Sequence, residues 1–388
     1  MATPKLRFKE FDGDWSNKKI GNIASKVGSG STPRGGAEAY TDHGIIFIRS
    51  QNVNNDQLLL DDVAYIPEET HVKMSGSKVI ANDILLNITG ASIGRSCVVP
   101  HDFTEANVNQ HVCIIRTPND DPIFVQSFLS SENGQNAIQS KQAGGGREGL
   151  NFQAIRSIDF HFPPSKAEQT KIASFLSAVD EKISQLTQKH ALLSQYKQGM
   201  MQKLFSQQIR FKADDGSEFG EWEDKKLGDI CSHFQSGKTI TSATISDNGA
   251  YPVFGGNGLR GFTDTYTHDG IFALIGRQGA LCGNINLVQG ENFISEHAIA
   301  VQANQESSTQ WLAMWLDFMQ LNRFSESSAQ AGLAVNKLVK FDIKVPCLEE
   351  QTKIANFLSA IDQKIEVVAQ QIEQAKTWKK GLLQQMFV

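Results

Sequence analysis

The sequence predicts an α+β protein built as two similar halves, each a small mixed α/β domain followed by a long helix. Three observations predict this. A segment of 13 residues recurs almost unchanged 182 residues later, each copy opens an apolar pattern of helical period, and short strands with glycine-rich turns precede each copy. Because a repeated segment marks duplicated structural units, we expect the order domain, helix, domain, helix.

The clearest repeat lies at the start of each expected long helix, where residues 168–180 read EQTKIASFLSAVD and residues 350–362 read EQTKIANFLSAID. A second repeat opens each half. The first half begins with LRFK, a tryptophan and KKIGNI, and the second half begins with the matching IRFK, a tryptophan and KKLGDI. These markers divide the chain into a first domain (1–163), a first helix (164–207), a second domain (208–346) and a second helix (347–388).

Both expected helices carry an apolar seam whose steps alternate between four and three residues, the coiled-coil pattern. Two seams in one chain most simply bury each other; a protein partner that covers part of them is the alternative. His190, Lys197 and Lys379 interrupt the seams, and we interpret them as seam-edge or register-fixing positions. The seam residues are Ile172, Leu176, Val179, Ile183, Leu186 and Leu193 in the first helix and Ile354, Leu358, Ile361, Ile365, Val368 and Ile372 in the second.

Short strands are expected in both domains. Residues 45–48, 83–88 and 112–115 in the first domain, and 270–275 in the second, are runs rich in Ile, Leu and Val, separated by clusters of Gly and Asn. Residues 311–324 are apolar at helical spacing and are expected in the core.

Composition limits the class of protein. The chain has 37 Lys+Arg against 42 Asp+Glu, which excludes a DNA binder that works by bulk positive charge but leaves room for local basic patches. It has no apolar run of 18 residues and starts with a charged segment, so we expect neither a membrane span nor a secretory signal. The 5 cysteines are scattered and form no C-x-x-C motif, which is typical of a reduced, cytoplasmic protein without a cysteine zinc site.

Two segments resemble catalytic motifs but lack necessary residues. Residues 236–239 read SGKT, like the end of a phosphate-binding loop, but Ser232 stands where that loop needs its first glycine. Residues 254–258 read FGGNG, similar to a motif of adenine methyltransferases, but the Pro-Pro-aromatic tetrapeptide of those enzymes is absent. We interpret both as turns, and we predict a noncatalytic chain because no nucleophile, base or metal-ligand motif occurs.

Two small domains joined by long helices can hold two binding surfaces a set distance apart. The 32 helical steps from Ile172 to Leu204 correspond to roughly 48 Å at ~1.5 Å per residue. That length equals about 14 base-pair steps of B-DNA. Two domains at such a separation would recognise two short, unlike sequences with unread base pairs between them. The approximate twofold relation of the halves matches the local dyad of duplex DNA.

Polar residues on the expected loops are candidates for reading bases. Arginine matches the O6/N7 edge of guanine, and Asn or Gln matches the N6/N7 edge of adenine. Taken singly, each such residue is more often solvated or turn-stabilising, so the prediction depends on the set. The candidates are Arg34, Arg49, Gln51, Asn52, Arg95, Asn109, Gln110, Arg147, Asn257, Arg260, Arg277 and Gln278.

Six kinds of segment follow one another along the chain: LRF with Trp15, GIIFIRSQNV at 44–53, DILLNITGASIG at 83–94, NVNQH at 107–111, YPVFGGNG at 251–258, and EQTKIA at both helix starts. Each segment alone is weakly diagnostic, but their combination and order are specific. Through them, nearly the whole chain resembles the specificity subunit of Type I restriction–modification systems.

The resemblance implies that each small domain is a target recognition domain that reads one half of a bipartite site in double-stranded DNA. The two long helices would pair as an antiparallel coiled coil with pseudo-twofold symmetry and fix the unread spacer. They would dock two modification (methyltransferase) subunits, which methylate adenine, and two restriction subunits where the assembly includes them. This chain would hold no cofactor, and S-adenosylmethionine, ATP and Mg²⁺ would bind the partner subunits.

Alternatives remain open at this point. A duplicated coiled-coil adaptor without DNA specificity is one, and a self-sufficient methyltransferase, which the missing tetrapeptide argues against, is another. The near-neutral charge predicts weak DNA binding by the isolated chain, with partners supplying much of the phosphate contact. Residues 275–279, IGRQG, differ from the corresponding first-half segment, which argues against a common contact scheme for the two halves.

Overall fold

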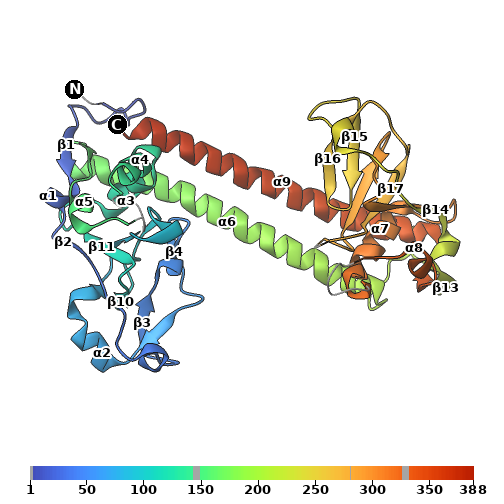
Figure 1. Cartoon of the computed structure of the whole chain (residues 1–388), viewed down its shortest axis with the longest axis horizontal. Helices are drawn as coiled ribbons and strands as arrows, with labels where there is room; N and C mark the ends of the chain where they lie inside the picture. The colour runs from blue at the N-terminus through green and yellow to red at the C-terminus, as the bar shows by residue number, and fades with distance from the viewer. Residues whose placement is uncertain (1–2, 143–148, 280, 326–331) are drawn as a thin grey trace. The chain divides into compact units, whose positions relative to one another are not determined.

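The computed structural model describes residues 3–142, 149–279, 281–325 and 332–388. The chain forms two compact units: unit 1 comprises Met1–Thr187 and Gln370–Val388, and unit 2 comprises Gln188–Ala369. Unit 1 therefore contains both ends of the chain. The amide of Leu6 donates to the carbonyl of Gln385 over 2.9 Å, so the N-terminal segment lies against the last helix (Figure 1).

Unit 1 is built on two four-stranded sheets. In hydrogen-bonded order these are β2 (Lys26–Ser29), β11 (Val112–Arg116), β8 (Ile84–Asn87) and β9 (Ser96–Val98), and β6 (Ala64–Ile66), β3 (Ile45–Ile48), β10 (Ala106–Val108) and β7 (Lys78–Val79). Two smaller ribbons pair β1 (Ser16–Lys19) with β12 (Asp159–Phe162) and β4 (Val53–Asn54) with β5 (Gln57–Leu58). The helices are α1 (Ile20–Ile23), α2 (Glu68–Lys73), α3 (Pro122–Ser130), α4 (Glu132–Ser140), α5 (Phe152–Arg156) and the first part of α6 (Lys166–Phe205).

The central strand β8 is apolar on both faces because both faces are covered. Ile84 and Leu86 point into a core shared with Phe124 and Phe128 of α3. Leu85, on the opposite face, packs in a second core with residues of β3 and β10. Since successive side chains of a strand point to opposite faces, the apolar residues Ile84, Leu85 and Leu86 within the segment predicted at 83–88 mark a strand between two layers.

Unit 2 has a corresponding four-stranded sheet in the order β14 (Cys231–Ser236), β20 (Ala298–Ala303), β17 (Ile271–Gly276) and β18 (Ile285–Gln289). Its other strands are β16 (Gly258–Thr263), β15 (Tyr251–Gly255) and β19 (Phe293–Ile294), which form one sheet, and the pair β13 (Glu223–Lys226) and β21 (Asp342–Val345). The helices are the rest of α6, α7 (Thr309–Phe318), α8 (Val335–Leu338) and most of α9 (Leu348–Met386).

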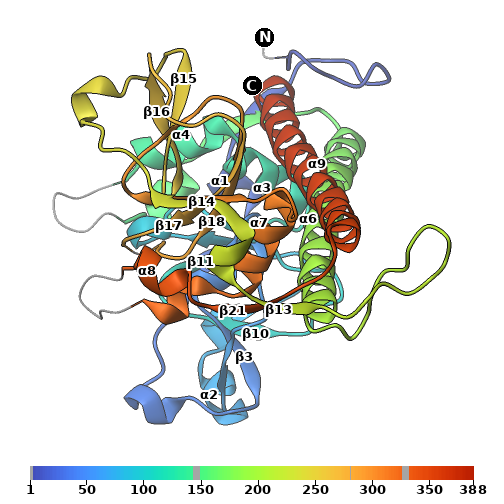
Figure 2. The same cartoon turned by 90° about the vertical axis from the view of Figure 1, so that its right-hand side faces the viewer.

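Helix α7 packs on the sheet of unit 2 (Figure 2), where Trp311 and Leu312 are buried against Ile275 and Val301. The apolar segment 311–324 is not one continuous helix. Gln320 has a φ of +49°, a left-handed conformation that ends α7, and a short 3₁₀ turn follows. The core position predicted for its first part is confirmed.

Each long helix is attached to its domain by a buried Glu–Gln pair. The Glu168 carboxylate accepts hydrogen bonds from Arg7 Nε (2.7 Å) and Trp15 Nε1 (3.2 Å). The next residue, Gln169, accepts from the backbone N–H of Asp121, the N-cap of α3, over 2.9 Å. These bonds tie the start of α6 to the rest of unit 1.

Unit 2 repeats this attachment. Glu350 accepts from Arg210 (2.8 Å) and from Trp222 Nε1 (3.1 Å), and Gln351 accepts from the N–H of Ser308, the N-cap of α7, over 2.8 Å. The repeated LRF/IRF, Trp and EQTKIA segments are therefore the parts of one structural joint. A buried carboxylate needs such partners, since an unpaired buried charge is strongly destabilising.

The two long helices pair antiparallel in each unit. In unit 1, Leu176 and Val179 of α6 share a core with Leu382 and Met386 near the end of α9. In unit 2, residues near the end of α6 share a core with residues near the start of α9. The predicted α+β class with paired long helices is confirmed. Most seam residues are buried, and Ile183, Leu193 and Ile365 are half-buried. No helix in the described ranges is long and apolar enough to cross a membrane.

Candidate nucleic-acid interface

Four loops of unit 1 meet at the ends of β2, β3, β8 and β10. Strands β3 and β10 are parallel, so the loops that follow them start side by side. The N–H of Asn109 donates to the carbonyl of Ile48 (3.0 Å), and the N–H of Ile88 donates to the carbonyl of His111 (3.0 Å). Gly30, after β2, packs against this junction so closely that a Cβ there would lie 1.6 Å from the carbonyl oxygen of Val108.

A row of hydrogen-bonded polar side chains crosses these loops. The Thr32 hydroxyl donates to Gln110 Oε1 (2.7 Å), the Gln110 amide nitrogen lies 3.0 Å from His111 Nε2, and His111 Nδ1 lies 2.6 Å from the Thr89 hydroxyl. If the amide donates to Nε2, the imidazole proton sits on Nδ1 and is donated to Thr89. We call Thr32, Gln110, His111 and Thr89 the polar row. It offers donors and acceptors on an exposed to half-buried surface, as base recognition requires.

Three candidates follow β3 and make contacts within the protein, and of these only Asn52 is buried. Asp62 lies 3.6 Å from the Arg49 guanidinium and accepts from the Gln51 amide over 2.8 Å. Asn52 is buried: its amide donates to the carbonyls of Leu59 and Asp62, and its oxygen accepts from the N–H of Arg49. Asn52 therefore holds the loop in shape and is not presented on the surface.

The remaining candidates of unit 1 have different positions. Asn109 is also buried, and its side-chain oxygen accepts from the N–H of His111 over 2.9 Å, so it too shapes a loop. Arg34 and Arg95 are exposed. Arg147 lies outside the described residues.

Unit 2 has the same loop junction. The N–H of Ser295 donates to the carbonyl of Phe254 (2.8 Å), as Asn109 does to Ile48, and the N–H of Arg277 donates to the carbonyl of His297 (3.0 Å), as Ile88 does to His111. Four pairs of loops thereby correspond: 29–32 with 236–239, 49–52 with 255–258, 89–94 with 278–279 and 281–283, and 109–111 with 295–297.

The shared junction is a common backbone scaffold, and it does not test the expectation that the two halves contact DNA by different schemes. Gly90 and Gly279 have positive φ values of 69° and 81°, and Gly94 and Gly283 have 89° and 86°. The loop geometry is therefore common to both units, and the side chains on it differ. Sequence comparison missed this because few residues besides these glycines match.

The same junction explains the two segments that resemble catalytic motifs. Gly237 of SGKT is the counterpart of Gly30, and a Cβ there would lie 2.4 Å from the carbonyl oxygen of Ile294. Gly256 of FGGNG crosses Gly276, and a Cβ on it would lie 2.7 Å from the Cα of that residue. Both glycines are needed where loops cross at close range.

Three candidates of unit 2 come together around a hollow of roughly 240 Å³. Exposed Asn257, Arg260 and Gln278 line it with His297 and the buried backbone of Gly255 and Gly256. Arg277 does not line this hollow, and its guanidinium donates to the Ser236 hydroxyl over 3.2 Å. His111 and His297 were not among the sequence candidates, although the match of QHV at 110–112 with EHA at 296–298 was a signal for them.

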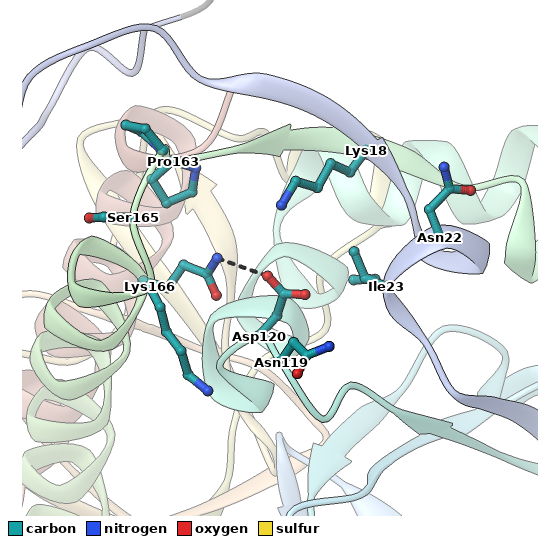
Figure 3. A pocket seen from close by; sticks show the side chains of 10 residues that line it. Lys18, Asn22, Ile23, Asn119, Asp120, Pro163, Ser165 and Lys166 are labelled. Carbon is teal, nitrogen blue, oxygen red and sulfur yellow. Dashed lines mark hydrogen bonds between the residues drawn. The ribbon is translucent and has the colours of Figure 1, made fainter.

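Unit 1 has a hollow of roughly 560 Å³ beside the start of α6 (Figure 3). Lys18, Asn119, Asp120 and Lys166 are among the residues that line it. Asp120 accepts a hydrogen bond from the Gln169 amide over 3.0 Å, so this hollow borders the helix attachment.

Two observations on the described residues bear on catalysis. Burial raises the pKa of Cys113 and of Cys231 to about 12, so neither thiol is a ready nucleophile near neutral pH. Within the described ranges, no group of three or more His, Cys, Asp or Glu side chains is placed to hold a metal ion.

Comparison with known proteins gives a consistent result. Residues 12–195 and 220–377 match the family model of the Type I restriction modification DNA specificity domain. Over 208 residues the chain is 34% identical to the EcoprrI type I restriction enzyme specificity subunit of Escherichia coli; this covers 52% of the chain and 51% of that protein, about half its length. It is 21% identical to the putative MjaX specificity subunit of Methanocaldococcus jannaschii, covering 98% of the chain and 94% of that protein. The crystal structure of the Type-I restriction-modification system S subunit from M. genitalium superimposes with a TM-score of 0.68 at 18% identity, over 100% of this chain and 99% of that one.

Proposed function

The chain belongs to the Type I restriction modification DNA specificity family, and from that premise we propose that it is the noncatalytic subunit that reads the DNA sequence for a modification and restriction complex. Unit 1 reads one half of a bipartite site and unit 2 reads the other. The paired long helices keep the two halves of the site a fixed number of base pairs apart.

The observation that carries this proposal is the duplicated loop junction. Each unit exposes polar side chains on glycine-rich loops that strand pairing and close backbone crossings hold in place. Rigid loops that present amides, hydroxyls, imidazoles and an arginine can match the donor and acceptor pattern of base edges. The scaffold is common and the side chains differ, as expected if the two halves of the site differ in sequence.

The partners follow from the same proposal. Two modification subunits and, where the assembly includes them, two restriction subunits would dock on this chain. S-adenosylmethionine, ATP and Mg²⁺ would act on those partners. The net charge of −5 suits a subunit that relies on its partners for part of the phosphate contact. A coiled-coil adaptor without DNA specificity is the competing proposal.

The test is methylome mapping of cells that express the cognate modification subunit with and without this chain. We expect methylated adenines in one bipartite motif only when the chain is present. Methylation that does not depend on the chain, or complexes that assemble without any sequence-specific methylation, would favour the adaptor.

A further inference from the structure

We infer that Arg260 is the residue by which unit 2 selects a guanine in its half of the DNA site, and that Gln278 reads a neighbouring purine. This inference rests on the proposed function. Both side chains are exposed on the rim of the hollow described above; Arg260 lies in β16, two residues beyond loop 255–258, and Gln278 lies in the loop that follows β17.

Arg260 is available to a ligand. Within the described part of the chain, its guanidinium has no ion-pair or hydrogen-bond partner. Its stem passes over the hollow, since a Cβ added to Gly255 would lie 2.8 Å from its Cδ. Gly255 has no side chain, which lets the Arg260 stem lie against its backbone, and Gly256 has none because the backbone of Gly276 and His297 crosses it closely.

The equivalent loop of unit 1 is closed by its own contacts. Arg49 and Gln51 stand at the positions of Gly255 and Asn257. Arg49 pairs with the Asp62 carboxylate, and the Gln51 amide donates a hydrogen bond to it. Unit 1 instead presents Gln110 in its polar row. The counterpart of Gln110 in unit 2 is Glu296, one of whose oxygens accepts from the N–H of Ile240 over 3.3 Å while the other lies 3.5 Å from His297 Nε2. The two units thus expose different side chains from one scaffold.

The chemistry favours guanine for Arg260. A guanidinium presents two parallel donors, and guanine presents two acceptors, O6 and N7, on its major-groove edge. A lysine, with a single point charge, does not reproduce this geometry. A glutamine amide has one donor group and one acceptor, which match the N6/N7 edge of adenine and, less fully, other purine edges.

The experiment maps the methylome of cells that carry the cognate modification subunit with the wild-type chain, R260A, R260K, Q278A or Q110A. We expect R260A to relax one guanine position by roughly 5- to 150-fold in discrimination, with R260K only partly restoring it. Q278A should alter a neighbouring position of the same half-site. Q110A should alter the other half-site, and the spacer should stay unchanged in all variants.

R323A is the matched control, because Arg323 is an exposed arginine of unit 2 that lies over the Phe324 ring and does not line the hollow. It should leave the motif unchanged. If R260A lowers methylation uniformly without changing the motif, Arg260 contacts phosphate and the inference is overturned, whereas the proposed function stands. If the wild-type chain directs no sequence-specific methylation, the proposed function itself fails.

Discussion

The ammonium of Lys379 on α9 lies 2.7 Å from the carboxylate of Asp180 on α6. It also lies 2.9 Å from Asp56, at the tip of the β4–β5 hairpin. In unit 2, the equivalent residues of the repeat form the reciprocal pair, with Lys197 of α6 lying 2.6 Å from Asp362 of α9. Two seam interruptions in the sequence are therefore ion pairs between the helices. Such pairs fix the helix register, because a shift of either helix would separate the charges.

Replacing Lys379 with methionine should destabilise unit 1. Burial alone lowers the pKa of Lys379, but Asp56 and Asp180 outweigh it and raise the pKa above its ordinary value, so the lysine is charged. Its loss leaves both carboxylates without their cation, at a cost of about 1–3 kcal/mol in the free energy of unfolding. Denaturant titration measures this. K376M removes an exposed lysine that pairs with Glu373 on the same helix and should cost under about 0.5 kcal/mol; equal losses in both variants would refute the role of Lys379.

Replacing a glutamate of the helix attachment should loosen only its own unit. In E168Q the Arg7 guanidinium and the Trp15 indole lose a buried carboxylate, and breaking a buried pair costs about 3–5 kcal/mol. Hydrogen exchange should show reduced protection of β1 and β12 in E168Q and of β13 and β21 in E350Q. E181Q, at an exposed position of α6, is the control. Reduced protection of both ribbons in either variant would contradict the independence of the two attachments.

Gly237→Ala should destabilise unit 2 although the side chain it adds is only a methyl group. That methyl would lie 2.3 Å from the carbonyl oxygen of Ser295, and such overpacking costs about 1–3 kcal/mol. Thermal unfolding compares it with G220A, where an added Cβ meets no atom within 4 Å. An unchanged unfolding temperature in G237A would mean that the loop crossing is not tight.

Unit 2 should lose stability as the pH falls below neutral. Burial, helped by His233 and Lys238, lowers the pKa of His268 from 6.5 to about 4. As the pH falls, His268 is protonated in the unfolded chain before it is protonated in the folded chain. Its contribution to the free energy of unfolding is therefore fully present above about pH 6.5 and is lost as the pH falls toward 4. Unfolding temperatures at pH 7.5 and 5.0 test this. H268Q should show a smaller loss than the wild type, and an equal loss would assign the effect to other groups.

The sequence predicted the architecture because duplication and seam periodicity are properties of the chain itself. It did not separate surface candidates from loop scaffolding, because Asn52, Asn109 and Gln110 are the same kind of residue until their hydrogen bonds are known. The Asn52 side chain is hydrogen-bonded to backbone groups up to 10 residues away, whereas the Gln110 side chain is exposed. No sequence pattern encodes that difference.

The joint between each helix and its domain was visible as a repeat, but its chemistry was not. Glu168 and Glu350 look like exposed helix-start carboxylates, yet both are fully buried. Their partners, Arg7 and Arg210, stand about 150 residues away in the chain, so only the fold brings them together. The recurrence of LRF/IRF, Trp and EQ was the one available signal of this contact.

The measurement that tests the central claim most directly is methylome mapping of a chain with four residues inserted in phase in α6. Four residues add ~6 Å of helix, which compares with ~3.4 Å per base pair of B-DNA. If the paired helices set the distance between the DNA-binding surfaces of units 1 and 2, the spacer between the half-sites should lengthen by about one or two base pairs. Both half-sites should keep their sequences. An unchanged spacer in a complex that still methylates DNA would contradict the account.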